Sequence, residues 1–165
     1  MPIERLGQTS LSSGRAVVID RRAAEWDARG VLVEELPRGT FAIQGERAGV
    51  GTPWRDVWIE LAAGEPVAHE FAGTVSVEVE PLMLIDESAV AAWSAADRDG
   101  VTAEAIELST KSATGSGELE LADGRVCVFA TSWGDGVFPV FVDRDRSGQP
   151  VRVRVRLQND ATDDE

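Results

Sequence analysis

Residues 137–157 carry the clearest fold signal: Val137-Phe138-Pro139-Val140-Phe141-Val142, Asp143-Arg144-Asp145-Arg146-Ser147-Gly148, and, after Gln149-Pro150, Val151-Arg152-Val153-Arg154-Val155-Arg156-Leu157. Two apolar, β-branched runs flank a polar segment that contains Gly, which is the pattern of a β-hairpin. In the second run valine alternates with arginine. Because successive side chains of a strand point to opposite faces, the valines are predicted to pack inward. The three arginines then face solvent or an acidic neighbouring strand.

Other segments repeat this β pattern. Residues 118–121 and 125–129 predict a second hairpin around an Asp-Gly turn. Residues 74–80 alternate valine with polar residues, as in a strand with one wet face. Further strands are expected at 15–20, 40–44, 56–61 and 66–71, and residues 31–36 fit either a strand or an extension of a helix. Capped, alanine-rich segments predict short helices at 21–30 and 88–96, and 102–111 fits another.

These elements predict a mainly β or α+β fold. It consists of two packed antiparallel sheets, or one strongly curved sheet, with one or two short covering helices. The length of 165 residues and the apolar fraction of 43% suit one domain with its own core. We expect that domain to span residues 13–158, after an N-terminal arm (1–12) and before an acidic tail (159–165).

Charge and composition exclude several classes of protein. The net charge of −13 argues against direct nucleic-acid binding, which needs clustered cations. No apolar run approaches the roughly 20 residues that cross a bilayer, and the N-terminus lacks a secretory signal. A soluble, cytoplasmic protein without membrane contact is therefore expected. The single cysteine, Cys127, permits no internal disulfide and lies in an apolar run typical of a buried strand.

Two features resemble ligand sites but have simpler explanations. Residues 143–148 match the opening of a calcium loop, yet Arg154 occupies the position where the bidentate glutamate is required. A hairpin turn explains the same residues. His69 is the only histidine, so a typical zinc site is not available and a structural or surface role is expected. We therefore predict no metal, no cofactor and no catalytic residue of these kinds.

The segment Ser132-Trp133-Gly134-Asp135-Gly136 leaves two interpretations open. Its glycines permit a tight turn in which Asp135 caps local N–H groups and Trp133 packs on the sheet. They would equally let the carboxylate face a ligand. Asp20, Asp86 and Asp135 each end an apolar segment, and carboxylates that converge to within about 6 Å could bind a cation or transfer protons. Each of the three also fits a capping role.

Several stretches resemble the bacterial domain-of-unknown-function 4241 family. The most specific is residues 132–157, which hold Trp-Gly-Asp-Gly, an aromatic-Pro pair and the last hairpin; residues 13–20, 36–43 and 84–86 also fit. Phe138 and Phe141 stand where the family usually has Tyr, and the closing Asp-Phe is replaced near Arg156-Leu157. The resemblance implies a compact β-rich domain with no known activity, and it draws attention to Asp20, Asp86 and Asp135.

Two functional hypotheses follow. The first is a non-enzymatic protein- or ligand-binding module, because the chain lacks a nucleophile–base set while Trp54, Trp58 and Trp133 look exposed. An immunity-type role, in which the acidic domain neutralises a basic toxin, is one version of it. The ligand or partner candidates are Trp133, Asp135, Asp86 and Asp20. The alternative is a metal-dependent hydrolase that uses the carboxylates of Asp20, Asp86 and Asp135.

Overall fold

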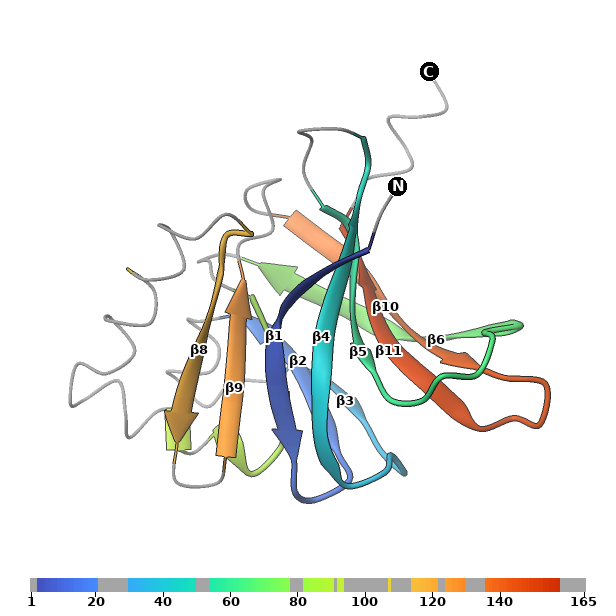
Figure 1. The fold of residues 1–165 in the computed structure, drawn as a ribbon, viewed down its shortest axis with the longest axis horizontal. Helices are drawn as coiled ribbons and strands as arrows, with labels where there is room; N and C mark the ends of the chain where they lie inside the picture. Colours follow the sequence, from blue (N-terminus) through green and yellow to red (C-terminus); the bar gives the residue numbers. More distant parts are fainter. Residues whose placement is uncertain are drawn as a thin grey trace.

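The computed structural model describes residues 3–20, 30–49, 54–77, 82–90, 92–93, 107, 114–121, 124–129 and 136–157. These residues form two packed antiparallel sheets (Figure 1). Sheet A has the strand order β1 (Ile3–Leu11), β4 (Gly39–Arg47), β5 (Trp54–Glu60), β11 (Pro150–Arg156), β10 (Gly136–Arg144), β6 (Ala68–Val77). Sheet B has the order β3 (Val31–Val33), β2 (Ala16–Asp20), β7 (Leu82–Asp86), β9 (Gly124–Phe129), β8 (Ser116–Leu121).

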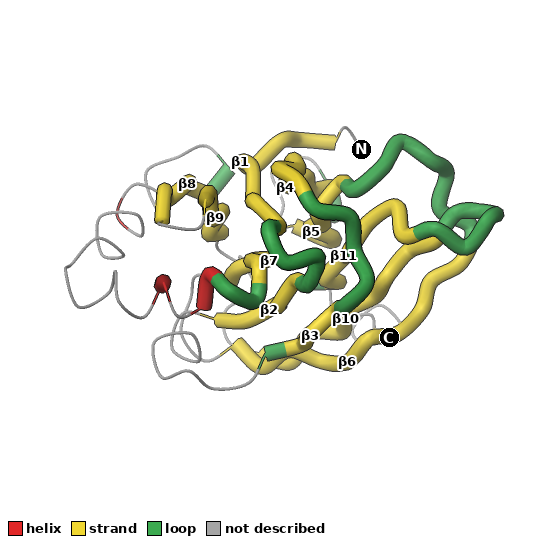
Figure 2. The backbone as a smooth tube through the Cα atoms, turned by 90° about the horizontal axis from the view of Figure 1, so that it is seen from below, coloured by secondary structure: helices red, strands yellow, loops and turns green. Residues whose placement is uncertain are grey.

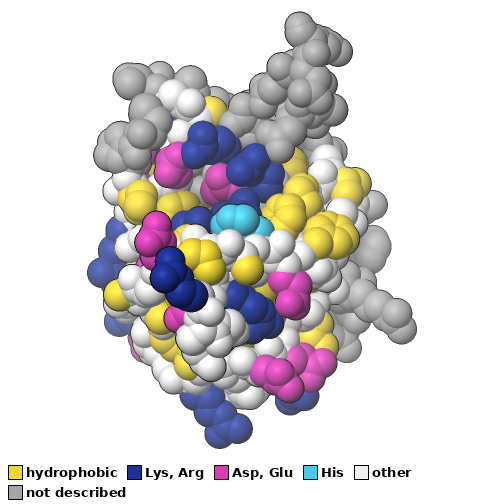
Figure 3. Space-filling view, turned by 90° about the vertical axis from the view of Figure 1, so that its right-hand side faces the viewer, with side chains coloured by type: hydrophobic (Ala, Val, Ile, Leu, Met, Phe, Trp, Pro, Cys, Tyr) yellow, Lys and Arg dark blue, Asp and Glu magenta, His cyan; other side chains and the backbone are white. Residues whose placement is uncertain are grey.

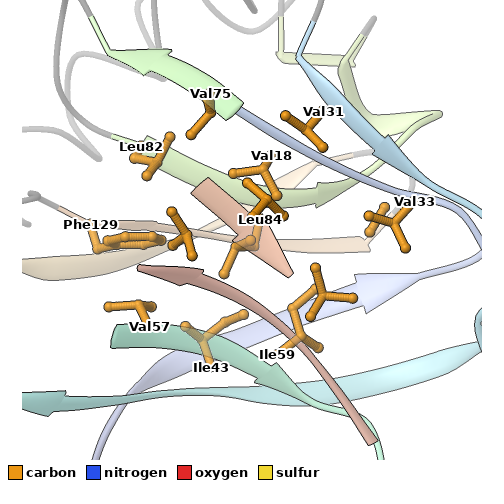
Figure 4. Packing of buried hydrophobic residues seen from close by; sticks show 14 of the residues in the cluster. Val18, Val31, Val33, Ile43, Val57, Ile59, Val75, Leu82, Leu84 and Phe129 are labelled. Atoms are coloured by element: carbon orange, nitrogen blue, oxygen red, sulfur yellow. The ribbon is translucent and has the colours of Figure 1, made fainter. Parts of the chain in front are cut away.

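The main core lies between the two sheets. Alternate residues of the central strands of sheet A face alternate residues of sheet B, as strand periodicity requires. Ile43, Val57 and Ile59 on one side meet Val18 and Leu84 on the other, all fully buried (Figure 4). The alternation in β11 is confirmed, since Val151, Val153 and Val155 are buried.

Sheet B is apolar on both faces. Its second face carries Val17, Ile19, Met83, Ile85, Val126 and Val128, which pack with Ala89, Val90 and Trp93 in a smaller core. Within the predicted helix 88–96, the described residues Ala89, Val90, Ala92 and Trp93 have helical backbone (Figure 2), although no complete helix lies in the described ranges. The second core explains why β2 and β7 read as continuous apolar runs.

The prediction of two packed antiparallel sheets is confirmed, and so are both hairpins. Residues 31–33 form a strand and do not extend a helix. The segments predicted as separate strands, 66–71 and 74–80, share one strand, β6. Apart from Gly30 and Glu107, the predicted helices 21–30 and 102–111 lie outside the described residues. No helix among the described residues is long and apolar enough to cross a bilayer.

The predicted N-terminal arm is wrong for residues 3–11. These residues form β1, which pairs with β4 from Ile3↔Glu46 to Leu11↔Gly39 and buries Leu6 and Leu11. A register shift between Arg5 and Gly7 interrupts the strand. The inward positions after this shift are Gly7, Thr9 and Leu11, so this part of the strand has only one large apolar residue on its buried face. Hydrophobic alternation therefore gave no signal there.

Candidate functional site

The outer face of sheet A carries a regular array of charged and aromatic side chains centred on the arginines of β11. Strand pairing places Arg152 and Arg154 in rows with residues of β5, β10 and β6, and it places Arg156 opposite a residue of β5. The rows are Glu60–Arg152–Asp143–His69, then Trp58–Arg154–Phe141–Phe71, then Asp56–Arg156. We call this set of residues, with Arg55 and Glu46, the arginine face.

Asp143 is the centre of the array and is fully buried. Arg154 donates to it twice, from Nε to Oδ2 at 2.9 Å and from Nη2 to Oδ1 at 3.2 Å. Arg152 Nε donates to Oδ2 at 2.5 Å, and His69 Nδ1 lies 2.7 Å from Oδ1. Such charge-assisted, bidentate contacts fix both the guanidinium and the carboxylate in place.

Asp56 holds the other side of the same arginine set. Its Oδ1 accepts from Arg154 Nη1 at 3.0 Å and from Arg156 Nε at 2.9 Å. Arg55 forms ion pairs with Asp56 and with Glu46. Two buried aspartates thus orient four arginines, which agrees with the prediction that the alternating arginines face solvent or an acidic neighbouring strand.

Aromatic rings lie directly beneath the guanidinium groups. Arg152 Cζ lies 4.9 Å from the ring centre of Trp58, and Arg154 Cζ lies 4.7 Å from that of Phe141. Trp58 and Trp54 are only 2% and 1% exposed, so the prediction that both are exposed is wrong. Arginine covers Trp58, and Trp54 joins the main core, where Arg47 lies over its ring. Trp133 lies outside the described residues.

A hollow of about 270 Å³ opens on this face. Its lining residues are Glu46, Arg55, Asp56, Trp58, His69, Arg152, Arg154 and Arg156, which include four arginines and two carboxylates. Figure 3 shows the histidine (cyan) among arginine side chains (dark blue), with hydrophobic side chains (yellow) beside it. The lining is therefore richer in cations than in anions, although the whole chain has a net charge of −13.

The sequence-predicted carboxylates do not converge in the described structure. In the β2–β7 pair, Ala16 lies opposite Asp86 and Asp20 lies opposite Leu82, so the two aspartates are at opposite ends, about 13 Å apart along the strands. Asp86 is bound locally by the N–H and hydroxyl groups of Ser13 and Ser88. Asp135 lies outside the described residues. The hydrolase alternative requires Asp20 and Asp86 to approach each other, and they do not, because antiparallel pairing of β2 with β7 places the ends of the two strands apart.

Two other expectations are confirmed. Asp145 organises the β10–β11 turn by accepting from the N–H groups of Ser147 and Gln149, so the calcium-like segment is a turn. Cys127 is fully buried, and burial raises the pKa of its thiol to about 12. Among the described residues, no group of three or more His, Cys, Asp or Glu could hold a metal ion.

Sequence reasoning missed Asp56, and it considered Asp143 only as part of the calcium-like segment or hairpin turn. The signal was their place in the strand alternation. Both residues stand at outward-facing positions of strands whose inward-facing positions hold buried apolar residues. Charges at such positions next to an Arg-Val-Arg-Val-Arg strand indicate cross-strand ion pairs. The strand order, which puts β5 and β10 on either side of β11, was needed to see that both serve the same arginine.

Acidification is predicted to destabilise the fold through Asp143 and Asp86. Burial alone would raise the pKa of each, but hydrogen bonds from Arg154 and His69 to Asp143, and from Ser88 and Ser13 to Asp86, hold both pKa values below the ordinary 3.8. A depressed carboxyl pKa stabilises the folded state above the unfolded-state value, and this stabilisation is lost as the pH falls through the folded-state pKa. The guanidinium chloride midpoint should therefore fall steeply below about pH 4. Asp86→Asn should reduce that fall, and an unchanged pH dependence in the variant would contradict the assignment.

Comparison with family models, with curated proteins and with solved structures finds no match to this chain. The resemblance to the domain-of-unknown-function 4241 family stays a prediction.

Proposed function

We propose that the chain is a non-enzymatic binding module and that its partner docks on the arginine face. The observation that carries the proposal is the arginine array, which two buried aspartates hold in a fixed arrangement around a hollow. Ordering flexible arginines on binding costs conformational entropy, and an array that is already ordered avoids much of that cost. Arginine and aromatic residues are also the side chains most enriched in protein interfaces.

An apolar rim adjoins the array on β6. Phe71 is 60% exposed and contacts Phe141 edge to face, with ring centres 5.9 Å apart. Val67, just before β6, is 52% exposed. A large exposed aromatic beside fixed cations is a suitable anchor for a partner that presents an apolar side chain next to an acidic group.

The net charge of −13 supports an immunity-type version of this proposal. A basic toxin would be attracted over long range by the acidic chain. An acidic side chain on that toxin would then enter the hollow, where the arginines lie. Long-range charge would set the association rate, and the arginine face would set the specificity.

The proposal predicts that Phe71→Ala weakens partner binding by about thirtyfold or more, because truncating an aromatic hot-spot residue costs about 2 kcal/mol or more. The measurement is capture from native-host extract on the immobilised chain, followed by titration of the captured protein. Ile3→Ala is the matched control, since Ile3 is 56% exposed on the opposite edge strand of sheet A. Equal binding by both variants, or no captured protein, would refute the proposed function.

A further inference from the structure

We propose that the hollow in the arginine face is an oxyanion site, which takes a phosphate or carboxylate group through Arg152 and His69. This inference deepens the proposed function and rests on it for the biological role of the site. Its own test needs no partner protein. The proposal is supported by a comparison of the nitrogen donors in the hollow, because some of them already donate to protein carboxylates and others do not.

Arg154 is a structural residue of the site, because its Nε, Nη1 and Nη2 all donate to the two buried aspartates. Arg152 differs. Only its Nε bonds to Asp143, and its two Nη groups make no hydrogen bond to the part of the chain that the structure describes. Its guanidinium is held over Trp58, so the two Nη groups are fixed in orientation. A guanidinium that is held in place and still has both Nη groups available as donors is suited to bind an oxyanion.

Two further side chains line the same hollow. His69 uses Nδ1 toward Asp143, which leaves Nε2 without a hydrogen bond among the described residues, and its side chain is 50% exposed. Arg55 Nε is buried and lies 3.4 Å from Asp56 without forming a hydrogen bond in the described structure. A ligand atom in the hollow cannot reach this buried nitrogen, so Arg55 contributes its positive charge to the lining and not this N–H group.

Charge and size define the ligand class. Four arginines and two carboxylates line the hollow, and Asp143 beneath them pairs with Arg152 and Arg154, so one positive charge remains in excess and favours an anion over a cation. A hollow of about 270 Å³ accommodates a single phosphate or carboxylate group with part of its carrier. A long polyanion such as a nucleic acid would be repelled by the net charge of −13. The ligand is therefore one oxyanion group, either free or carried by a small molecule or a partner side chain.

The test is titration of the full chain with inorganic phosphate and, separately, with sodium acetate, at constant ionic strength set with chloride. Binding is followed by NMR through the arginine Nε–H, tryptophan indole and histidine ring signals. Saturable shifts confined to Arg152, Trp58 and His69 are expected. A phosphate response identifies a phosphoryl ligand and an acetate response a carboxylate ligand. The absence of both, or shifts spread evenly over the surface, overturns the site.

Matched variants separate the site from general charge effects. Arg152→Gln should weaken binding about tenfold, as expected for losing a charge-assisted hydrogen bond. Arg15→Gln removes the same charge from an exposed pair with Glu87 and should leave affinity unchanged. Equal loss in both variants refutes the role of Arg152.

Glu46→Gln tests the site in the opposite direction. Glu46 pairs with Arg55 at the hollow, so removing its charge should tighten oxyanion binding severalfold. Glu87→Gln is its control, because Glu87 pairs with Arg15 and is not among the residues that line the hollow. This pair remains informative if Arg152→Gln does not fold. Failure of the oxyanion site with intact partner capture would leave the proposed function standing, and lost capture with intact phosphate binding would remove the proposed function alone.

Discussion

Replacing Asp143 with Asn is expected to lower the free energy of unfolding by about 3–5 kcal/mol, because breaking a buried ion pair leaves an uncompensated charge. Asp143 is fully buried and accepts from Arg152 and from both Nε and Nη2 of Arg154. Arg154 is itself only 7% exposed. Asparagine keeps one oxygen but points an NH₂ group toward the guanidinium, so the loss combines charge and geometry.

Guanidinium chloride denaturation of wild type and variant measures this loss. Glu70→Gln is the matched control, because Glu70 lies on the neighbouring strand β6 and pairs with Arg144 while 61% of its side chain is exposed. An exposed pair of this kind contributes about 0–1 kcal/mol. If both variants lost the same amount, Asp143 would not be the centre of the array. Arg154→Met should cost less than Asp143→Asn, since Asp143 would retain Arg152 and His69.

The arginine face also shows how far the sequence predicts this molecule. Period-two alternation in residues 151–157 placed the three arginines on one face and their valine neighbours in the core, because strand geometry is local. The acidic partners were not local. Asp56 and Arg154 are separated by 98 positions in the chain and meet only because β5 and β11 are neighbours. Strand order depends on the packing of the whole domain, which periodicity does not encode.

Because periodicity does not encode strand order, the sequence could not decide whether the carboxylates of the hydrolase hypothesis converge. Asp20 and Asp86 both end apolar segments, and this pattern alone cannot distinguish strand ends that meet from strand ends that lie apart. Antiparallel pairing of β2 with β7 places them at opposite ends. Burial was similarly misjudged for Trp58, because Asp56 and Glu60, its neighbours on the same face of the strand, are charged, and the tryptophan looks exposed until the arginine that covers it is known.

The second large effect on stability is expected at Trp93, which lies within the predicted helix 88–96. Trp93 is fully buried and packs with Ile19, Met83 and Val128 on the face of sheet B away from the main core. Truncating a buried aromatic to Ala removes its transfer free energy and leaves a cavity, which costs about 3–5 kcal/mol. Trp93→Ala should therefore lower the free energy of unfolding by that amount, as measured by chemical denaturation.

Trp93→Phe separates the packing of the ring from its polar atom. The indole Nε1 is buried and makes no hydrogen bond within the described ranges. Phenylalanine keeps most of the ring and removes this unsatisfied donor, which should offset part of the packing that the substitution loses. The free energy of unfolding should therefore fall by less than about 1.5 kcal/mol. Neither variant should change phosphate binding, because the arginine face belongs to sheet A. A Trp93→Ala variant as stable as wild type would mean that sheet B does not need its second core, and the apolar outer faces of β2 and β7 would then lack an explanation.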